Sequence, residues 1–268
     1  MAARPDVHLV RRGAGPPLVL LHGIGGEACV WDPVLDALAE RHDVLALDLP
    51  GFGRSAPLPD GVEPSPAALA AAVAEVLHDL GLRDAVHVAG NSLGGWIALE
   101  LAKAGRARSV TALCPAGLWG GPLLGDGETP VQGRGQRLAA RLRPLIPVAL
   151  RSRRVRHAVL APFVAHPERV PYRDAWRMVS SYARATAYAA TNVAMRRATL
   201  GDVSGIAVPV TVAFGERDRL IRPNPLAVPG ARTVTLPDCG HIPMFDAPEL
   251  VVEVIETTVR AGSIAMAR

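Results

Sequence analysis

The chain has 268 residues, of which 49% are hydrophobic and 20% are charged, a composition typical of a globular protein with one substantial core. It contains no run of eighteen apolar residues and its first residues lack the apolar segment of a signal peptide, so we expect no membrane insertion and a cytoplasmic location. The three cysteines have no metal-type spacing, which argues against a zinc site or a disulfide framework and favours small buried side chains.

The net charge of +4 conceals a strongly basic segment. Fourteen arginines lie between residues 133 and 200, where the only acidic residues are Glu168 and Asp174. A solvated helical insertion explains this composition, and attraction to an anionic substrate, carrier or membrane surface is the alternative. No recognition module accompanies the charge, so we expect no nucleic-acid partner. The sequence specifies no oligomeric state.

Apolar runs alternate with amphipathic stretches along the first part of the chain. Runs rich in Val, Leu and Ala predict short strands at residues 7–10, 18–21, 43–49, 85–89 and 109–114. Helical spacing of apolar residues predicts helices at residues 31–41, 65–81 and 96–101. Alternation of this kind predicts an α/β fold whose mostly parallel sheet carries helices on both faces.

The alternation stops after Gly117 and resumes near residue 206. Between these points, residues 118–205 predict helices near 136–145, 147–159, 174–190 and 193–200, which we interpret as an inserted helical lid, or cap. Strands at 208–214 and 233–236 and a helix at 248–260 follow, and we expect the tail after Ala261 to fray. The core therefore comprises residues 1–117 and 206–268.

A serine stands at the turn between a predicted strand and a predicted helix, in the segment Gly-Asn-Ser-Leu-Gly-Gly at residues 90–95. Gly90 and Gly94 lack side chains, so the turn can close sharply and hold the Ser92 hydroxyl at its apex. This is the G-x-S-x-G pattern of a nucleophile elbow. Its position between a strand and a helix favours catalysis over an ordinary glycine-rich turn.

A serine that transfers an acyl group needs a base and a carboxylate that orients the base. His241 follows the last predicted strand and Asp218 follows the strand before it. Because the carboxyl ends of parallel strands meet at one edge of a sheet, Ser92, Asp218 and His241 can converge. Asp238 and Asp246 are nearer to His241 in the sequence and could replace Asp218, which we prefer because it ends a strong strand.

The chain resembles the α/β-hydrolase superfamily, in its small lidded branch, at residues 22–26, 48–55, 90–95, 215–218 and 240–241. The resemblance implies that Ser92 is the nucleophile, that His241 is the general base and then the general acid, and that Asp218 holds His241. It implies oxyanion donors at the backbone N–H groups of Ile24 and Leu93, with a shift of the first donor to Gly25 as an alternative. It implies no metal and no organic cofactor.

The serine also separates this chain from the haloalkane dehalogenases and epoxide hydrolases of the fold, which use an aspartate at the elbow. We therefore expect hydrolysis of a small to medium carboxylic ester. Hydrolysis of a carbon-carbon bond in ring-fission diketones is an alternative, because Asn91 and residues 114–118 resemble those enzymes, although Ile242 stands where they commonly have Trp. Cofactor-free perhydrolysis is another, and a small-ligand binding module is the non-enzymatic alternative.

Two further expectations concern polar residues around the elbow. His22 precedes the glycine-rich loop and is expected to hold its backbone, while Asp48 and Arg54 are expected to brace the loop that they belong to. Arginines of the lid, such as Arg177 or Arg184, could bind a substrate carboxylate through a bidentate fork.

Overall fold

The computed structural model describes residues 6–123, 133–224 and 228–266. Within them, seven strands form one sheet in the order β1-β3-β2-β4-β5-β6-β7. Strand β1 pairs antiparallel with β3 and all other neighbours pair in parallel, which confirms the predicted mostly parallel sheet. The strands are β1 Leu9–Arg12, β2 Pro17–Leu21, β3 Asp43–Leu47, β4 Val86–Asn91, β5 Ala107–Leu113, β6 Val210–Gly215 and β7 Arg232–Leu236.

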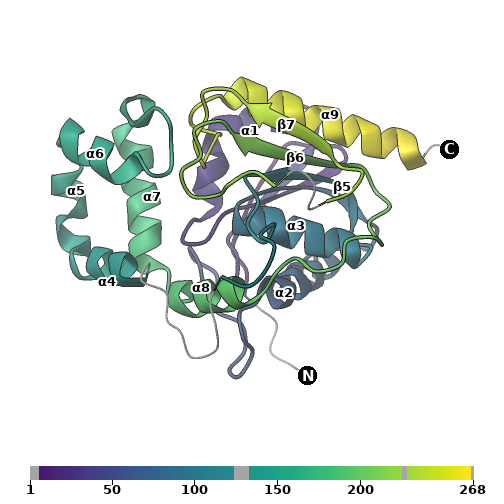
Figure 1. Ribbon diagram of the computed structural model, residues 1–268, viewed down its shortest axis with the longest axis horizontal. Coiled ribbons are helices and arrows are strands. Elements are labelled where there is room, and N and C mark those ends of the chain that lie inside the picture. Colours follow the sequence, from purple (N-terminus) through teal and green to yellow (C-terminus); the bar gives the residue numbers. More distant parts are fainter. Residues whose placement is uncertain (1–5, 124–132, 225–227, 267–268) are drawn as a thin grey trace.

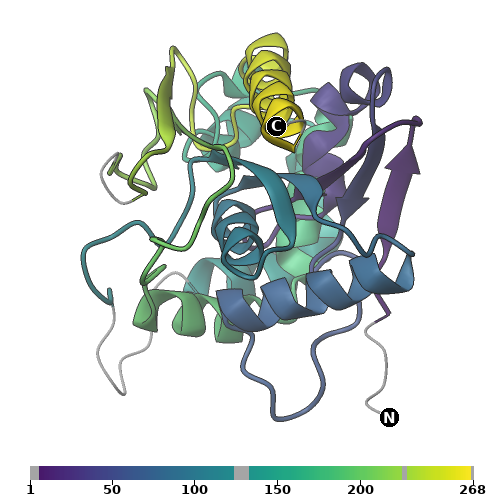
Figure 2. The same ribbon diagram turned by 90° about the vertical axis from the view of Figure 1, so that its right-hand side faces the viewer.

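Helices cover both faces of this sheet, with α1 and α9 on one side and α2 and α3 on the other (Figure 2). In β2, Leu18 and Leu20 pack into the layer of α1 and α9, while Val19 and Leu21 pack into the opposite layer. All four side chains are buried, because successive residues of a strand point to opposite faces and both faces are covered. These helices are α1 Asp32–Ala39, α2 Pro66–Asp79, α3 Leu93–Lys103 and α9 Pro248–Met266.

The segment between β5 and β6 is helical. Figure 1 shows α4 to α7 grouped at one end of the molecule, beyond the sheet, whereas α8 lies beside α2. The helices stand where the sequence predicts an inserted helical segment, and its boundaries at 118 and 205 and its role as a lid stay predictions. Their bounds are α4 Gly133–Arg141, α5 Ile146–Ala149, α6 Arg153–Leu160, α7 Tyr172–Arg184 and α8 Tyr188–Arg197, with short 3-10 turns at Ala28–Trp31, Arg143–Leu145 and Pro167–Arg169.

Two helix boundaries in this segment differ from the prediction. The single helix predicted over residues 147–159 is divided into α5 and α6, because Ser152 begins a new helix and its hydroxyl accepts the N–H of Val155. The break predicted between residues 190 and 193 lies earlier, at Ala185, whose ψ of 94° ends α7. Apolar periodicity predicts where helical segments lie but does not predict these local breaks between helices.

The prediction of a frayed tail after Ala261 was wrong, since α9 continues to Met266. Gly262 allows the helix to run close to β5: a Cβ atom at this position would lie 2.8 Å from the Cβ of Ser109. Contact with the sheet therefore extends the helix by more than a turn.

Two expectations from composition can be compared with the described residues. Cys29, Cys114 and Cys239 are buried and unpaired, as expected for small core side chains. No helix in residues 6–123, 133–224 or 228–266 has the length and apolar character needed to cross a bilayer.

Candidate active site

Ser92 occupies the sharp turn between β4 and α3. Its backbone has φ 55° and ψ −116°, a conformation that non-glycine residues rarely adopt. The two flanking glycines make the turn possible, because a Cβ atom at Gly90 would lie 2.1 Å from the carbonyl oxygen of Gly94. The N–H of Ser92 donates to the carbonyl of Leu113 at 2.9 Å, which fixes the turn against β5. The geometry is that of a nucleophile elbow.

Asp218 and His241 lie in contact although they are 23 positions apart in the sequence. Nδ1 of His241 donates to Oδ2 of Asp218 at 2.8 Å, and both side chains are buried. The other carboxylate oxygen accepts the N–H groups of Leu220 and Ile221 at 2.7 and 3.0 Å. The carboxylate therefore fixes the tautomer of His241 and leaves Nε2 available for a proton from another group.

These contacts decide the ionisation of Asp218. Burial by itself raises the pKa of this carboxyl group, but the hydrogen bond and charge of His241, together with the N–H groups of Ile221 and Leu220, lower the pKa below its ordinary value. Asp218 is therefore ionised at neutral pH and can accept the Nδ1 proton of His241.

Asn91 connects the elbow to the histidine loop. Its side-chain N–H groups donate to the carbonyl of His241 at 2.8 Å and to that of Leu113 at 3.2 Å, and the amide is buried. Ser92 follows Asn91 directly, so this bridge brings the serine and the histidine to the same edge of the sheet. The sequence offers no signal for the bridge except the position of Asn91 next to the elbow serine.

Asp246 supports the histidine loop from the other side. Its buried carboxylate accepts the N–H of Gly240 at 2.8 Å and the N–H groups of Ala165 and His166, each at 2.9 Å. It thereby ties the segment between α6 and α7 to the residue before His241. Asp246 is also an alternative partner of His241 in the sequence, but its carboxylate accepts from these backbone groups instead.

Asp238, the other alternative, also points elsewhere. Its carboxylate pairs with Nε2 of His166 at 2.6 Å and with Arg217 at 2.7 Å. Within the part of the chain that the structure describes, the carboxylate bonded to His241 is that of Asp218.

The glycine-rich loop after β2 runs beside Ser92. A Cβ atom at Gly23 would lie 3.0 Å from the Cβ of Ser92, so Ile24 follows a residue that is in direct contact with the elbow. His22 braces this loop, as predicted: Nδ1 donates to the carbonyl of Gly23 at 2.7 Å and Nε2 accepts the N–H of Leu49 at 2.9 Å. Burial lowers the pKa of His22, which keeps the ring neutral and able to make both bonds.

Asp48 braces the neighbouring loops, also as predicted. Its carboxylate accepts the N–H of Ala28 at 2.7 Å and the N–H of Arg54 at 2.9 Å. The first bond holds the chain just after the glycine-rich loop, and the second closes the loop after β3.

Aromatic residues of the helical segment cover the glycine-rich loop. A Cβ atom at Gly25 would lie 2.7 Å from the ring of Tyr182 and 3.2 Å from that of Tyr188. These two rings meet edge to face, with centroids 5.0 Å apart. The backbone of Gly25 has φ +78° and fits against the two tyrosine rings only because glycine has no side chain.

Arg177 and Arg184, predicted as candidate ligands of a substrate carboxylate, are both paired with carboxylates outside the helical segment. Arg184 donates to Glu27 at 3.0 Å, and Arg177 pairs with Asp32. Both therefore attach α7 to the segment that follows the glycine-rich loop.

Cys114 lies close to the Asp218–His241 pair. The donor atoms of these three residues all fall within 4.8 Å of one another, which is close enough to hold a cation. Burial raises the pKa of the Cys114 thiol well above its ordinary value, so the thiolate that a metal requires is disfavoured. Its Sγ instead accepts the N–H of Gly215 at 3.3 Å and contacts the carbonyl of Gly240 at 3.7 Å, joining the two loops.

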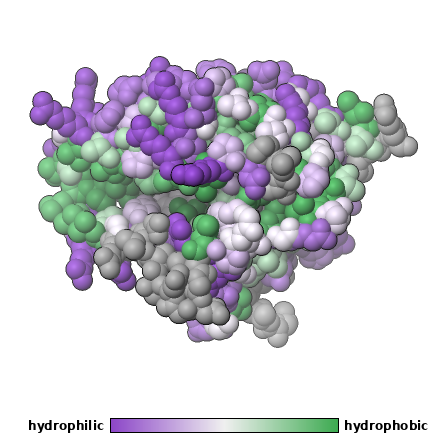
Figure 3. Space-filling view, viewed as in Figure 1, coloured by the Kyte–Doolittle hydropathy of each residue, from purple (hydrophilic) through white to green (hydrophobic). Residues whose placement is uncertain are grey.

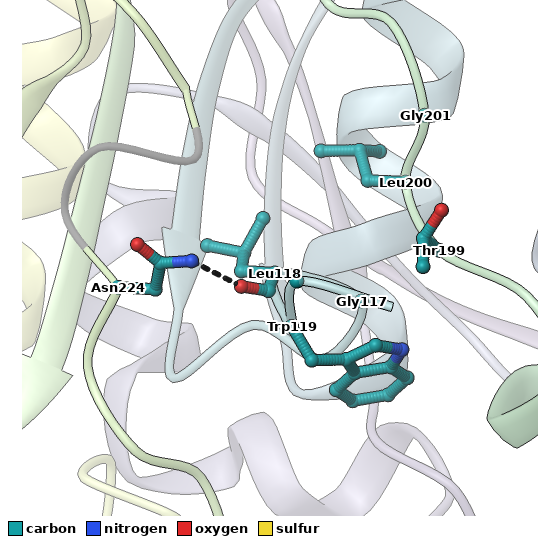
Figure 4. Close-up of a pocket in the computed structure, with 8 residues that line it drawn as sticks. Gly117, Leu118, Trp119, Thr199, Leu200, Gly201 and Asn224 are labelled. Carbon is teal, nitrogen blue, oxygen red and sulfur yellow. Dashed lines mark hydrogen bonds between the residues drawn. The ribbon is translucent and has the colours of Figure 1, made fainter. Parts of the chain in front are cut away.

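A separate cavity of about 250 Å³ lies where the chain enters and leaves the helical segment (Figure 4). Figure 4 shows the amide of Asn224 reaching the carbonyl of Leu118, a bond of 2.6 Å. Its described lining does not include Ser92, Asp218 or His241, so it is not formed by the proposed reacting groups. The lining residues are Gly117, Leu118, Trp119, Gly120, Thr199, Leu200, Gly201 and Asn224.

Comparison with known proteins agrees with this fold. The model of the alpha/beta hydrolase family matches residues 18–254 of the chain. The chain belongs to this family. Epoxide hydrolase EphH of Mycobacterium tuberculosis is 34% identical to this alpha/beta hydrolase over 210 residues, covering 73% of the chain and 95% of that protein.

Two further relatives extend over nearly the whole chain. A pimeloyl-[acyl-carrier protein] methyl ester esterase of Aeromonas hydrophila is 29% identical over 271 residues, covering 94% of the chain and 98% of that protein. The crystal structure of the enol-lactonase from Burkholderia xenovorans matches with a TM-score of 0.75 and 25% identity, covering 96% of this chain and 97% of that one. These relatives support hydrolase activity. Their names describe the hydrolysis of different bonds, in an epoxide, a methyl ester and an enol lactone.

Proposed function

We propose that this alpha/beta hydrolase cleaves a carboxylic ester of a small to medium molecule, with Ser92, His241 and Asp218 as its catalytic triad. The observation that carries the proposal is the buried Asp218–His241 pair, which Asn91 ties to the elbow that presents Ser92. An ionised carboxylate bonded to Nδ1 leaves Nε2 of His241 as the base. A binding module would need no such pair.

In the first half-reaction, Nε2 of His241 takes the proton of Ser92 as the hydroxyl oxygen attacks the acyl carbonyl carbon. The tetrahedral intermediate collapses when His241 returns the proton to the leaving alcohol, which leaves an acyl group on Ser92. In the second half-reaction, His241 removes a proton from water, the hydroxide attacks the acyl carbon, and Ser92 recovers its proton as the acid departs. Asp218 stabilises the imidazolium that forms in each half.

We assign the oxyanion donors to the backbone N–H groups of Leu93 and Ile24. Leu93 is the first residue of α3 and follows the nucleophile directly. Ile24 belongs to the loop that contacts Ser92 through Gly23. Donors that are fixed by a helix and by a braced loop need no reorganisation when charge develops on the oxygen, and each is worth about 100- to 1000-fold in turnover.

The nature of the nucleophile favours an acyl substrate over an epoxide, even though one relative is named an epoxide hydrolase. If the hydroxyl of Ser92 opened an epoxide, the product would be an ether, which water does not cleave in a second step. If it attacks an acyl carbon, the product is an ester, which water cleaves by the same route. An aspartate at the elbow would instead form an ester with an opened epoxide, and water can cleave that ester.

Substrate size depends on the helical segment, which we propose acts as a lid. Tyr182 and Tyr188 stand over the glycine-rich loop, so an acyl group held by the proposed oxyanion donors would meet their rings. Carbon-carbon bond hydrolysis uses the same three residues and is the second candidate, because Asn91 precedes the serine as in the hydrolases of ring-fission products that the chain resembles.

A substrate panel tests the proposal. We expect wild-type protein to hydrolyse p-nitrophenyl acetate and butyrate, Ser92→Ala to lose this activity, and Ser263→Ala, at an exposed serine of α9, to retain it. Styrene oxide and a ring-fission dienedione complete the panel. Preferred turnover of the dienedione would replace the ester assignment by carbon-carbon hydrolysis, and epoxide opening that survives Ser92→Ala would contradict the serine mechanism.

A further inference from the structure

Four large apolar side chains stand exposed at the outer end of the helical segment. They form what we name the cap tip, and their exposed fractions are 57% for Leu138, 45% for Leu142, 59% for Leu145 and 64% for Val148. Leu138, Leu142 and Leu145 follow one another at spacings of four and three residues, which places them on one stripe along α4 and the turn after it. The stripe is turned outward, although exposed Leu and Val side chains carry a hydration cost.

Exposed arginines flank the cap tip in the sequence. Arg137 and Arg141 lie one residue before Leu138 and Leu142 and so form a parallel stripe on α4. In the described ranges, no salt bridge engages these two or the four other exposed arginines of the neighbourhood, in contrast to Arg177 and Arg184. The other four are Arg143, Arg151, Arg153 and Arg154.

The apolar and basic side chains occupy one end of the molecule. Figure 3 shows a hydrophobic area at the end where Figure 1 places α5, with hydrophilic side chains above and below it. This end lies away from the sheet, so the core would not obstruct an extended flat surface that approached it (Figure 1).

We propose that the cap tip docks peripherally on a phospholipid bilayer that carries anionic headgroups. Leu145 and Val148 would enter the boundary between headgroups and acyl chains, and the six arginines would lie at the depth of the phosphates. The apolar side chains of the patch match the acyl chains of such a bilayer, and its arginines match the anionic headgroups. Nucleic acid matches the charge but offers the apolar side chains no partner. An acidic protein would need a dedicated apolar pocket for the most exposed side chains.

Docking of this kind requires no membrane-spanning element. The nine residues of α4 would lie in the plane of the interface rather than cross it. The proposal is independent of the reaction catalysed at Ser92, because the cap tip belongs to a different part of the molecule from Ser92, Asp218 and His241.

Vesicle flotation with the full chain tests the proposal. We expect the protein to float with vesicles of equal parts phosphatidylcholine and phosphatidylglycerol, and to remain behind with phosphatidylcholine alone. Raising the salt from about 0.01 M to about 1 M shortens the Debye length from about 30 Å to about 3 Å and should release it. Replacing Arg151, Arg153 and Arg154 together by Gln should weaken binding about 100-fold, since each basic residue near the surface contributes about fivefold.

The apolar contribution is tested separately. Leu145→Ser combined with Val148→Ser should weaken binding to the mixed vesicles, whereas Ile264→Ser, an equally exposed side chain at 58% on α9, should not. Circular dichroism of each variant establishes that the fold is retained. Equal flotation with both vesicle types, no flotation with either, or binding to polyglutamate or duplex DNA without binding to the mixed vesicles would each overturn the proposal.

Discussion

The side-chain amide of Asn91 donates a 2.8 Å hydrogen bond to the backbone carbonyl of His241, across 150 positions of sequence. Because Asn91 ends β4 and Ser92 follows it, this bond fixes the position of the histidine loop relative to Ser92, the proposed nucleophile. The same amide contacts Leu113 at the end of β5, so the bridge is anchored to the sheet. We interpret Asn91 as a positioning residue for His241.

Removal of this bridge should impair turnover more than folding. We expect Asn91→Ala to lower kcat for a p-nitrophenyl ester by about 100-fold, since a displacement of about 1 Å between reacting groups has an effect of that size. KM should change little. Asn224→Ala is the matched control, because that amide also donates to a backbone carbonyl, at Leu118, but borders the separate cavity. Equal losses in the two variants would contradict a positioning role for Asn91.

The glycine-rich loop offers a test of the oxyanion donors, which are backbone groups and cannot be removed directly. Gly25→Ala should displace the loop, because the added methyl group would meet the ring of Tyr182. We expect kcat to fall by about 100-fold, the size of one lost donor. The matched control is Gly61→Ala: Gly61 also has positive φ, at +83°, but has no atom within 4 Å of the added Cβ. Similar kcat values for the two variants would argue against the assignment.

Fold and site were predictable from sequence to different extents. Residues 18–21 are apolar on both faces because helices cover both sides of the sheet, and this local signal is sufficient to predict a parallel sheet. The association of Asp218 with His241 could be anticipated because both follow the carboxyl ends of neighbouring strands. The bridge from Asn91 and the clamp by Asp246 could not be anticipated, because they join side chains to distant backbone groups that no periodicity marks. The extension of α9 depends likewise on the contact of Gly262 with β5.

Replacement of Asp218 by Asn keeps the shape of the side chain but removes its charge. We expect Asp218→Asn to lower kcat by about 10,000-fold, since the amide no longer fixes the tautomer of His241 or stabilises its protonated form. The pKa of Asp218 is lowered from an ordinary value of about 3.9, so the carboxylate stays ionised at and above that pH and its contribution is lost only as the pH falls further. Stopped assays of wild-type protein from pH 5 to 8 should therefore show no effect of Asp218 titration. A fall in the kcat of wild-type protein near neutral pH that is absent from Asp218→Asn would show that Asp218 titrates there, and it would contradict the assignment.

His87, a buried residue of β4 whose ring lies near Gly262 of α9, should make stability depend on pH. Burial, with the nearby charges of Arg108 and His42, lowers its pKa to about 4. The unfolded chain takes up a proton on this residue below about pH 6.5, whereas the folded chain does not until about pH 4, so its contribution to stability is complete above pH 6.5 and declines as the pH falls toward 4.

Urea unfolding between pH 7.5 and 5 provides the measurement. We expect the free energy of unfolding to fall less steeply with decreasing pH in His87→Leu than in wild type. His78→Leu, at an exposed position of α2, should leave the slope unchanged. An unaltered slope in His87→Leu would show that His87 is not responsible.

The central claim is that Ser92 is an activated nucleophile. A fluorophosphonate probe reacts covalently with such a serine, and peptide mass spectrometry of the labelled protein identifies the modified residue. We predict a single adduct on Ser92 that disappears in Ser92→Ala and is strongly reduced in His241→Ala, with both variants folded by circular dichroism. Wild-type protein that remains unlabelled, or that carries the probe on another residue, would contradict the account.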